Sequence, residues 1–127
     1  MSLRIRVLVV DDEPSIRNSL VEYLEDCQVE VSAADSAEAA LDLIARVPID
    51  VALVDIRLPQ LDGDSLILQA HMLRPPMRFL IHTGSVDYQL PDDIKALGVT
   101  QEHVFAKPQM DLTVFRNAIY QLMNSDR

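Results

Sequence analysis

Four well-separated points of the sequence carry side chains that could handle a phosphate group. They are the pair Asp11-Asp12, the single Asp55, the pair Thr83-Gly84 and the single Lys107. Carboxylates that lie close together repel one another, and a bound divalent cation removes that repulsion. An aspartate can accept a phosphoryl group covalently, while a lysine and a hydroxyl can stabilise the charge on it. Brought together by a fold, these residue types predict phosphoryl transfer to a carboxylate, with Mg²⁺ as the cofactor.

Each of the four points stands at the end of an apolar run that reads as a buried strand. We expect strands at residues 5–10, 29–34, 51–54, 79–83 and 104–106. The run at 51–54 has apolar neighbours throughout, which is typical of a central parallel strand covered on both faces. Because ligands of open α/β sheets bind at the carboxyl ends of the strands, the chemistry-bearing residues belong at one edge of the predicted sheet.

Helical patterns separate these strands. Pro14 suits a first helical turn, and apolar residues continue after it at helical spacing. Asp35 and Glu38 form a capping pattern for a helix that ends near Arg46. Further helices are expected at residues 64–73, 91–97 and 111–124. The alternation predicts one α/β domain over residues 1–127, a flavodoxin-like doubly wound fold whose parallel sheet has the order 2-1-3-4-5 and helices on both faces.

The composition excludes several classes of function. The 20 acidic and 11 basic residues give a formal net charge of −9, which argues against direct binding of nucleic acid by this domain. Cys27 is the only cysteine, so no internal disulfide can form, which suits a reducing, cytoplasmic environment. No apolar run reaches the ~18–20 residues of a membrane span, so no membrane partner is expected.

Four short motifs stand at the predicted strand ends. They lie at residues 9–14 (VVDDEP), 55–63 (DIRLPQLDG), 81–84 (IHTG) and 107–108 (KP). Singly, an Asp-Asp or a Lys-Pro pair is a weak indication, but all four in this order are highly specific. Together they resemble the receiver domain of response regulators in two-component signalling, including the chemotaxis-regulator type. The resemblance covers essentially the whole chain.

The resemblance implies a phosphoacceptor and a metal site. Asp55 would accept the phosphoryl group. Asp12 would bind Mg²⁺ directly, Asp11 largely through water, and Asp55 and the backbone carbonyl of Arg57 would be further ligands. The side chains of Glu13 and Arg57 are expected beside the same site and within reach of each other.

The resemblance also implies roles for the residues at the other two strand ends. Thr83 would be the switch hydroxyl, and Lys107 would pair with the phosphoryl group. Gly84, which lacks a side chain, would let that group approach its backbone closely. The peptide bond between Lys107 and Pro108 is expected to be cis. His82 lies inside an apolar strand and is expected to be a core histidine with satisfied hydrogen bonds.

Two features depart from the family pattern. The family usually carries a rotating Tyr or Phe three residues before the lysine, and Val104 occupies that position here. Either the coupling works differently, or a register shift lets Phe105 substitute. The fourth helix is also short and starts at Pro91. Since the family dimerises through its fourth-helix, fifth-strand and fifth-helix face, a homodimer stays an open expectation.

The expected function is a signalling switch. A sensor histidine kinase or histidine phosphotransfer protein would phosphorylate Asp55, and the changed conformation would regulate a downstream effector domain or protein. The only catalysis expected is its own phosphorylation and dephosphorylation. Two alternatives are a receiver-fold binding module without phosphorylation and an Asp-nucleophile phosphatase of the haloacid-dehalogenase type. The phosphatase needs a second Asp two residues after the nucleophile, and Arg57 occupies that position.

Overall fold

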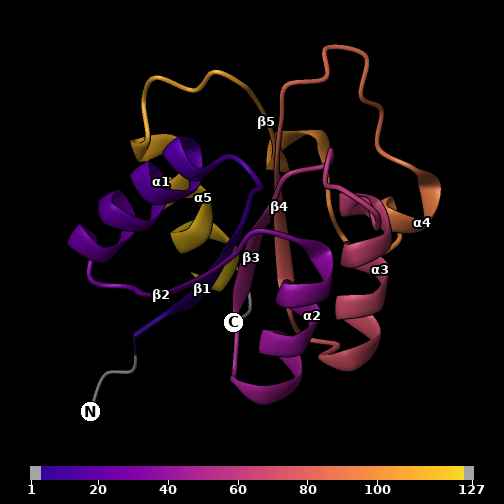
Figure 1. Ribbon diagram of the computed structural model, residues 1–127, viewed down its shortest axis with the longest axis horizontal. Helices are drawn as coiled ribbons and strands as arrows, with labels where there is room; N and C mark the ends of the chain where they lie inside the picture. The colour runs from indigo at the N-terminus through magenta and orange to yellow at the C-terminus, as the bar shows by residue number, and fades with distance from the viewer. Residues whose placement is uncertain (1–3, 125–127) are drawn as a thin grey trace.

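A five-stranded parallel sheet forms the centre of the computed structural model, which describes residues 4–124 (Figure 1). Its order is β2-β1-β3-β4-β5. The strands are β1 (Arg6–Val10), β2 (Glu30–Ala34), β3 (Val51–Val54), β4 (Arg78–Thr83) and β5 (Val104–Ala106). This confirms the predicted flavodoxin-like fold class and strand order. Strand ends differ from the predicted ones by one residue at most. A single domain over residues 1–127 stays a prediction.

Helices cover both faces of this sheet, in two layers. They are α1 (Pro14–Asp26), α2 (Ala37–Arg46), α3 (Gly63–Leu73), α4 (Asp92–Lys95) and α5 (Thr113–Asn124), with a 3₁₀ turn at Gln101–His103. Figure 1 shows α1 and α5 on one side of the sheet and α2, α3 and α4 on the other. No helix within residues 4–124 is long and apolar enough to cross a membrane.

Alternation along the strands divides the core between the two faces. In β1, Val7 and Val9 pack with the α1/α5 layer, whereas Leu8 and Val10 pack with the α2/α3/α4 layer. Every residue of β3 is buried, as expected of a central strand with helices on both sides. The two layers hold β3 firmly, so the residue that follows it has a well-defined position.

The start of α2 corrects one sequence prediction. The capping residue is Ser36 rather than Asp35: its side chain accepts a hydrogen bond from the N–H of Ala39, at 3.1 Å. Ser36 has the extended backbone that a cap requires, and the helix begins directly after it at Ala37. Glu38 lies in the first turn, where the helix dipole favours an acid.

Helix α4 is shorter than the predicted span of 91–97. After Lys95 the hydrogen bonds tighten, because the N–H of Leu97 and Gly98 donate to Ile94 and Lys95, three residues back. Gly98 then takes a φ of +97°, which glycine adopts without steric cost and which ends the helix. The short fourth helix is therefore a true feature of this chain.

Candidate functional site

The backbone carries the predicted site residues to one edge of the sheet. The N–H of Asp11 donates to the carbonyl of Ala34, and the N–H of Asp55 donates to that of Val10. These bonds extend the parallel ladders by one residue past β1 and β3. On the other side, the N–H of Lys107 donates to the carbonyl of Thr83, at 2.8 Å. Asp11, Asp55 and Lys107 therefore stand at the same edge of the sheet, as predicted.

Lys107 is the electrostatic centre of this edge. Its Nζ lies 3.0 Å from Asp11 Oδ2, 3.2 Å from Glu13 Oε1 and 3.3 Å from Asp55 Oδ2. Asp11 and Asp55 are almost fully buried, whereas Glu13 is exposed. One ammonium group thus holds three carboxylates at a single point.

The carboxylate of Asp55 is held from two sides. Its Oδ1 accepts the N–H of Arg57 at 3.2 Å, while Oδ2 accepts from Lys107. Behind it, the N–H of Gly63 donates to the carbonyl of Ile56, and a Cβ on Gly63 would collide with the carbonyl oxygen of Asp55. Only glycine fits there, so the start of α3 packs directly on the end of β3.

The pKa values of both central groups, Asp55 and Lys107, are raised, but for different reasons. Burial raises the pKa of Asp55, and the charge of Asp11 adds to this; the charge of Lys107 opposes both. Burial by itself lowers the pKa of Lys107, but its hydrogen bond to Asp11 and the charges of Asp11 and Asp55 raise it overall. The site carries more negative charge than Lys107 compensates, so a cation is favoured there.

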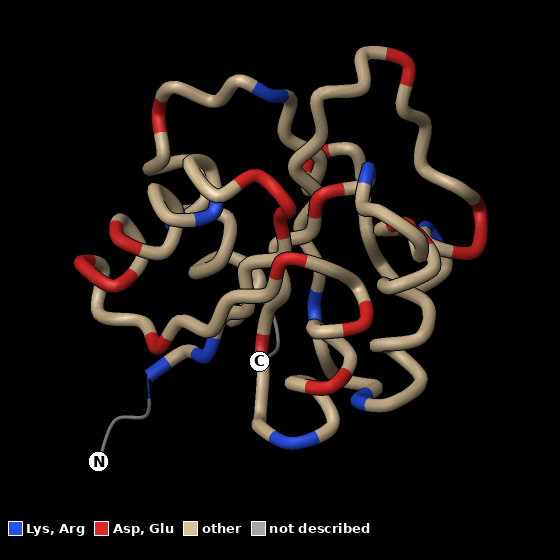
Figure 2. Tube along the Cα trace, viewed as in Figure 1, with Lys and Arg blue, Asp and Glu red and all other residues tan. Residues whose placement is uncertain are grey.

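The acidic residues fit a divalent metal. One carboxylate oxygen from each of Asp11, Asp12, Glu13 and Asp55 lies within 4.8 Å of the others. Figure 2 shows acidic residues gathered where β1 and β3 end. Hard oxygen donors of this kind suit Mg²⁺, which keeps several waters. The predicted ligands Asp11, Asp12 and Asp55 come together, and the part played by the Arg57 carbonyl stays a prediction.

Glu13 and Arg57, which could have paired with each other, do not do so within residues 4–124. Glu13 pairs with Lys107 instead, because a short bridge to a nearly buried ammonium is electrostatically stronger than one to an exposed side chain. The Arg57 side chain is exposed and makes no hydrogen bond or ion pair within residues 4–124. The sequence analysis placed Glu13 near the site but did not include it in the acidic cluster. The three consecutive acidic residues at 11–13 could have indicated it.

Arg17 is a second residue that sequence reasoning missed. Its Nη1 donates to the backbone carbonyl of Asp11 at 2.9 Å, so α1 reaches back over the connection that holds the acids. The N–H of Glu13 donates to Asp11 Oδ1 at 3.0 Å and tightens the same turn. The signal in the sequence was weak, since a basic residue early in a helix is common.

Thr83 lies beside the cluster without joining it. It is buried, and its Oγ1 accepts the N–H of Ser85 at 3.0 Å; within the described residues it makes no hydrogen bond to Asp55. A Cβ on Gly84 would only touch Lys107 at ordinary contact distance, so the role of Gly84 stays a prediction. The Lys107–Pro108 peptide bond is cis, as the resemblance implied.

Phe105 does not substitute for the missing aromatic residue. Strand β5 stays in register: Val104 is opposite Ile81 and packs on the α2/α3/α4 face. Phe105 lies on the other face, with its ring centroid 5.0 Å from that of Phe115. Because side chains alternate along a strand, a residue one position later cannot serve the same face. The register-shift hypothesis is therefore wrong.

His82 is buried as predicted, but its hydrogen bonds are not satisfied. The residue is 4% exposed, and neither ring nitrogen has a partner within residues 4–124. Its ring packs edge-on against Phe115, with centroids 4.9 Å apart. The core cluster on this face of the sheet is formed by apolar side chains.

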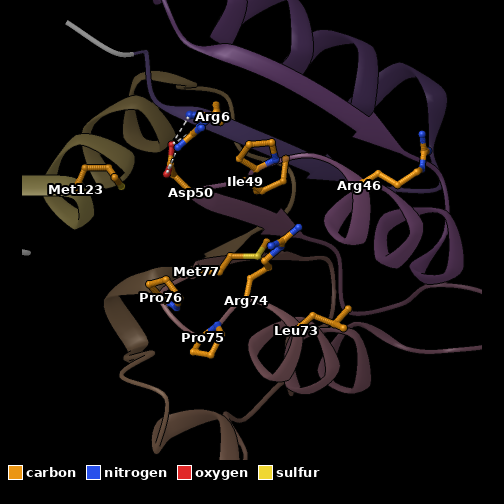
Figure 3. A pocket seen from close by; sticks show the side chains of 11 residues that line it. Arg6, Arg46, Ile49, Asp50, Leu73, Arg74, Pro75, Pro76, Met77 and Met123 are labelled. Carbon is orange, nitrogen blue, oxygen red and sulfur yellow. Dashed lines mark hydrogen bonds and ion pairs between the residues drawn. The ribbon is translucent and has the colours of Figure 1, made fainter.

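A cavity of about 670 Å³ lies at the opposite end of the sheet. Figure 3 shows Arg6 turned toward Asp50 at its edge and Arg74 pointing into it. Both arginines are engaged: Arg6 binds Asp50 through two nitrogens, and Arg74 donates to the carbonyls of Ile44 and Ala45. This end stabilises the fold and carries none of the predicted site residues.

Comparison with known proteins agrees with the geometry. The model of the response regulator receiver domain family matches residues 7–119. The transcriptional regulatory protein FixJ of Bradyrhizobium diazoefficiens is 31% identical over 98 residues, which cover 77% of this chain and 48% of FixJ. Sporulation initiation phosphotransferase F of Bacillus subtilis is 27% identical, with 90% of each protein covered.

The fold has equally clear counterparts. A CheY-like response regulator receiver domain from Methanospirillum hungatei superposes with a TM-score of 0.82 and 29% identity, over 98% of both chains. This chain spans about half the length of FixJ, so it corresponds to one part of that protein. It belongs to the response regulator receiver domain family and is a receiver domain of two-component signalling.

Proposed function

We propose that this receiver domain accepts a phosphoryl group on Asp55 from a phosphohistidine of a partner protein. The observation that supports this most is the buried Asp55 carboxylate, held by the Arg57 N–H and by Lys107 beside a cluster of acids. A carboxylate fixed at both oxygens is oriented for attack, which lowers the entropic cost of the reaction.

The transfer exchanges one bond to phosphorus for another. An Asp55 oxygen forms the new O–P bond while the P–N bond of the donor breaks, and the freed imidazole nitrogen takes up a proton. The ammonium group of Lys107 turns from the carboxylates to a phosphoryl oxygen and stabilises its negative charge. Asp11, Asp12, Asp55 and the Arg57 carbonyl would hold Mg²⁺. When bound, the ion supplies positive charge that stabilises the transferring group.

The switch and the partners are part of the same proposal. Thr83 would give up the bond to Ser85 and donate its hydroxyl to the phosphoryl group, which would move the loop before α4. A histidine kinase or phosphotransfer protein would be the donor, and an effector domain or protein the output. The name of the relative from Bacillus subtilis, a phosphotransferase, supports the chemistry. With one free cysteine, the domain suits the cytoplasm, the proposed location.

The phosphoacceptor can be tested with acetyl phosphate and Mg²⁺. Wild type should gain one phosphoryl adduct by intact mass, and Asp55→Asn should gain none, while retaining its circular dichroism spectrum. Asp87→Asn, in the exposed loop before α4, is the matched control and should behave as wild type. An adduct that persists at wild-type level in Asp55→Asn would assign the acceptor elsewhere.

The metal proposal has its own measurement. Millimolar Mg²⁺ should raise the melting temperature of the wild type, because the ion binds the folded acidic cluster and not the unfolded chain. Asp12→Ala should lose most of that rise. Without metal, the same variant should melt higher than wild type because one of several like charges is gone. A full Mg²⁺ response in Asp12→Ala would remove Asp12 from the ligand set.

A further inference from the structure

The three carboxylates that surround Lys107 differ in their exposure to solvent. The side chains of Asp11 and Asp55 are 3% and 5% exposed, whereas that of Glu13 is 56% exposed. The side chain of Lys107 is itself only 11% exposed. A phosphoryl donor arrives from solvent, so the exposed Glu13 carboxylate is the one of the three that it encounters first.

The ammonium group of Lys107 has as many partners as it has N–H bonds. A lysine ammonium offers three donors and no acceptor. Three carboxylate oxygens, one from each of Asp11, Glu13 and Asp55, lie between 3.0 and 3.3 Å from its Nζ. An incoming phosphoryl oxygen can therefore bind Lys107 only if one of these contacts opens.

The contact with Glu13 is the one that opens at the least cost. If Asp11 or Asp55 lost Lys107, a buried carboxylate would be left short of a partner, which is strongly destabilising. The exposed Glu13 carboxylate would instead be solvated by water, so the loss is smaller. While the donor approaches, Asp55 is still a carboxylate and keeps its own contact. The phosphoryl oxygen thus competes with Glu13 for Lys107.

Glu13 is held beside Lys107 by the start of α1. It is the N-cap residue, and its backbone carbonyl accepts the N–H of Arg17 at 2.9 Å. Its own N–H donates to Asp11 Oδ1 at 3.0 Å. Its side chain makes no capping hydrogen bond, so the carboxylate is free to accept a hydrogen bond from Lys107 at 3.2 Å. The charge of Glu13 therefore has a defined place at the site.

We propose that Glu13 is a specificity-determining residue for the phosphoryl donor. Its carboxylate competes with the phosphoryl oxygen for Lys107 and repels negative charge, so it slows transfer from small anionic donors. A partner protein can offset this repulsion through contacts elsewhere on its surface, which a small donor lacks. Glu13 thereby favours a protein phosphohistidine over free phosphoryl compounds. This inference rests on the proposed phosphorylation of Asp55 and adds the class of donor.

Glu13→Gln tests this role, because it removes the charge and keeps the size of the side chain. With acetyl phosphate at saturating Mg²⁺, an Asp55 oxygen forms the new O–P bond while the P–O bond of the donor breaks and acetate leaves. The initial rate, followed by intact mass at low ionic strength, should be about three- to fivefold higher in Glu13→Gln than in wild type. Higher salt should reduce the difference, because salt screens exposed charges.

A second donor and two further variants separate the charge of Glu13 from general effects. Phosphoramidate, which releases ammonia and carries less negative charge than acetyl phosphate, should show a smaller gain in Glu13→Gln. Glu13→Asp keeps the charge and should stay closer to wild type. Glu22→Gln, which removes the same charge from an exposed position farther along α1, should react as wild type.

The outcomes distinguish this inference from the phosphoacceptor proposal. The role of Glu13 is overturned if Glu13→Gln reacts with acetyl phosphate no faster than wild type, or if it gains as much with phosphoramidate. In both cases an adduct still forms, so Asp55 remains the proposed acceptor. If neither wild type nor Glu13→Gln gains an adduct, the phosphoacceptor proposal fails, and the role of Glu13 fails with it.

Discussion

The two faces of the sheet are built differently. On the α1/α5 face, the ring of Phe115 contacts the rings of both His82 and Phe105, edge-on in the first pair and tilted in the second. The opposite face is packed mainly by aliphatic and alanine side chains around the single buried ring of Phe79, and its last helix, α4, has four residues. The difference indicates that the α1/α5 face is a firm support for the site, while the region around α4 is the easier one to move.

Phe115→Ala should have the largest effect on stability. Phe115 is fully buried and contacts both other rings, so its removal should lower the free energy of unfolding by about 3–5 kcal/mol. Ile94→Ala, equally buried in α4, should cost only about 2 kcal/mol, because a one-turn helix can settle into the space. Urea unfolding measures both, and an Ile94→Ala loss as large as that of Phe115→Ala would contradict the comparison.

His82 should make the α1/α5 face sensitive to acid. Its pKa is lowered from 6.5 to about 4 by burial first and by Lys107 second, so the folded state favours the neutral ring. Between pH 6.5 and pH 4 the unfolded chain binds a proton that the folded chain does not. This contribution to stability is complete above pH 6.5 and falls by about 3 kcal/mol as the pH drops to 4.

The measurement is the difference in unfolding free energy between His82→Phe and wild type, followed with pH. Phenylalanine does not titrate and needs no hydrogen-bond partner, so the variant should gain relative to wild type as the pH falls from 7 to 4. Taking the difference cancels the carboxylates that titrate in both proteins. A constant difference over this range would mean that the His82 ring takes up its proton as readily in the folded protein as in the unfolded chain.

Strand ends were predictable from the sequence because a buried parallel strand leaves a continuous apolar run, and the residue after it must reach the sheet edge. Asp55 and Lys107 were placed in this way. The partners of side chains were not predictable. Glu13 pairs with Lys107, which is 94 residues away along the chain, so only the folded structure brings the two side chains together. Likewise, no local pattern reveals that the ring nitrogens of His82 lack partners within residues 4–124, since its surroundings come from segments far apart in the sequence.

Two tyrosine hydrogen bonds, one on each face, allow a matched comparison. Tyr88 Oη donates to Asp64 Oδ1 at 2.7 Å and ties the loop before α4 to the first turn of α3. Tyr120 Oη donates to the carbonyl of Cys27 at 3.0 Å on the α1/α5 side. Tyr88→Phe and Tyr120→Phe should each lower the unfolding free energy by about 1 kcal/mol.

Their effects on local motion should differ. Tyr88→Phe should speed amide hydrogen exchange in residues 84–90, because that loop loses its tie to α3, whereas Tyr120→Phe should leave this segment unchanged. A loop that exchanges equally fast in wild type and Tyr88→Phe would show that the bond to Asp64 does not restrain it. The α4 side would then be no easier to move than the other.

The smallest expected effect concerns the two rims of the site. Glu13, on the α1 side, is tied to Lys107, whereas Arg57, on the α3 side, is exposed and has no partner within residues 4–124. An untied long side chain can lie over the acyl phosphate and hinder water. Arg57→Ala should therefore shorten the phospho-Asp55 lifetime severalfold, which requires only ~1 kcal/mol in the barrier. Mg²⁺ affinity should hardly change, because the proposed ligand is the Arg57 carbonyl.

Phosphate release at saturating Mg²⁺ measures the lifetime, with Arg46→Ala on α2 as the control. A rate of phosphate release that is unchanged or slower in Arg57→Ala would show that the Arg57 side chain does not shield the site.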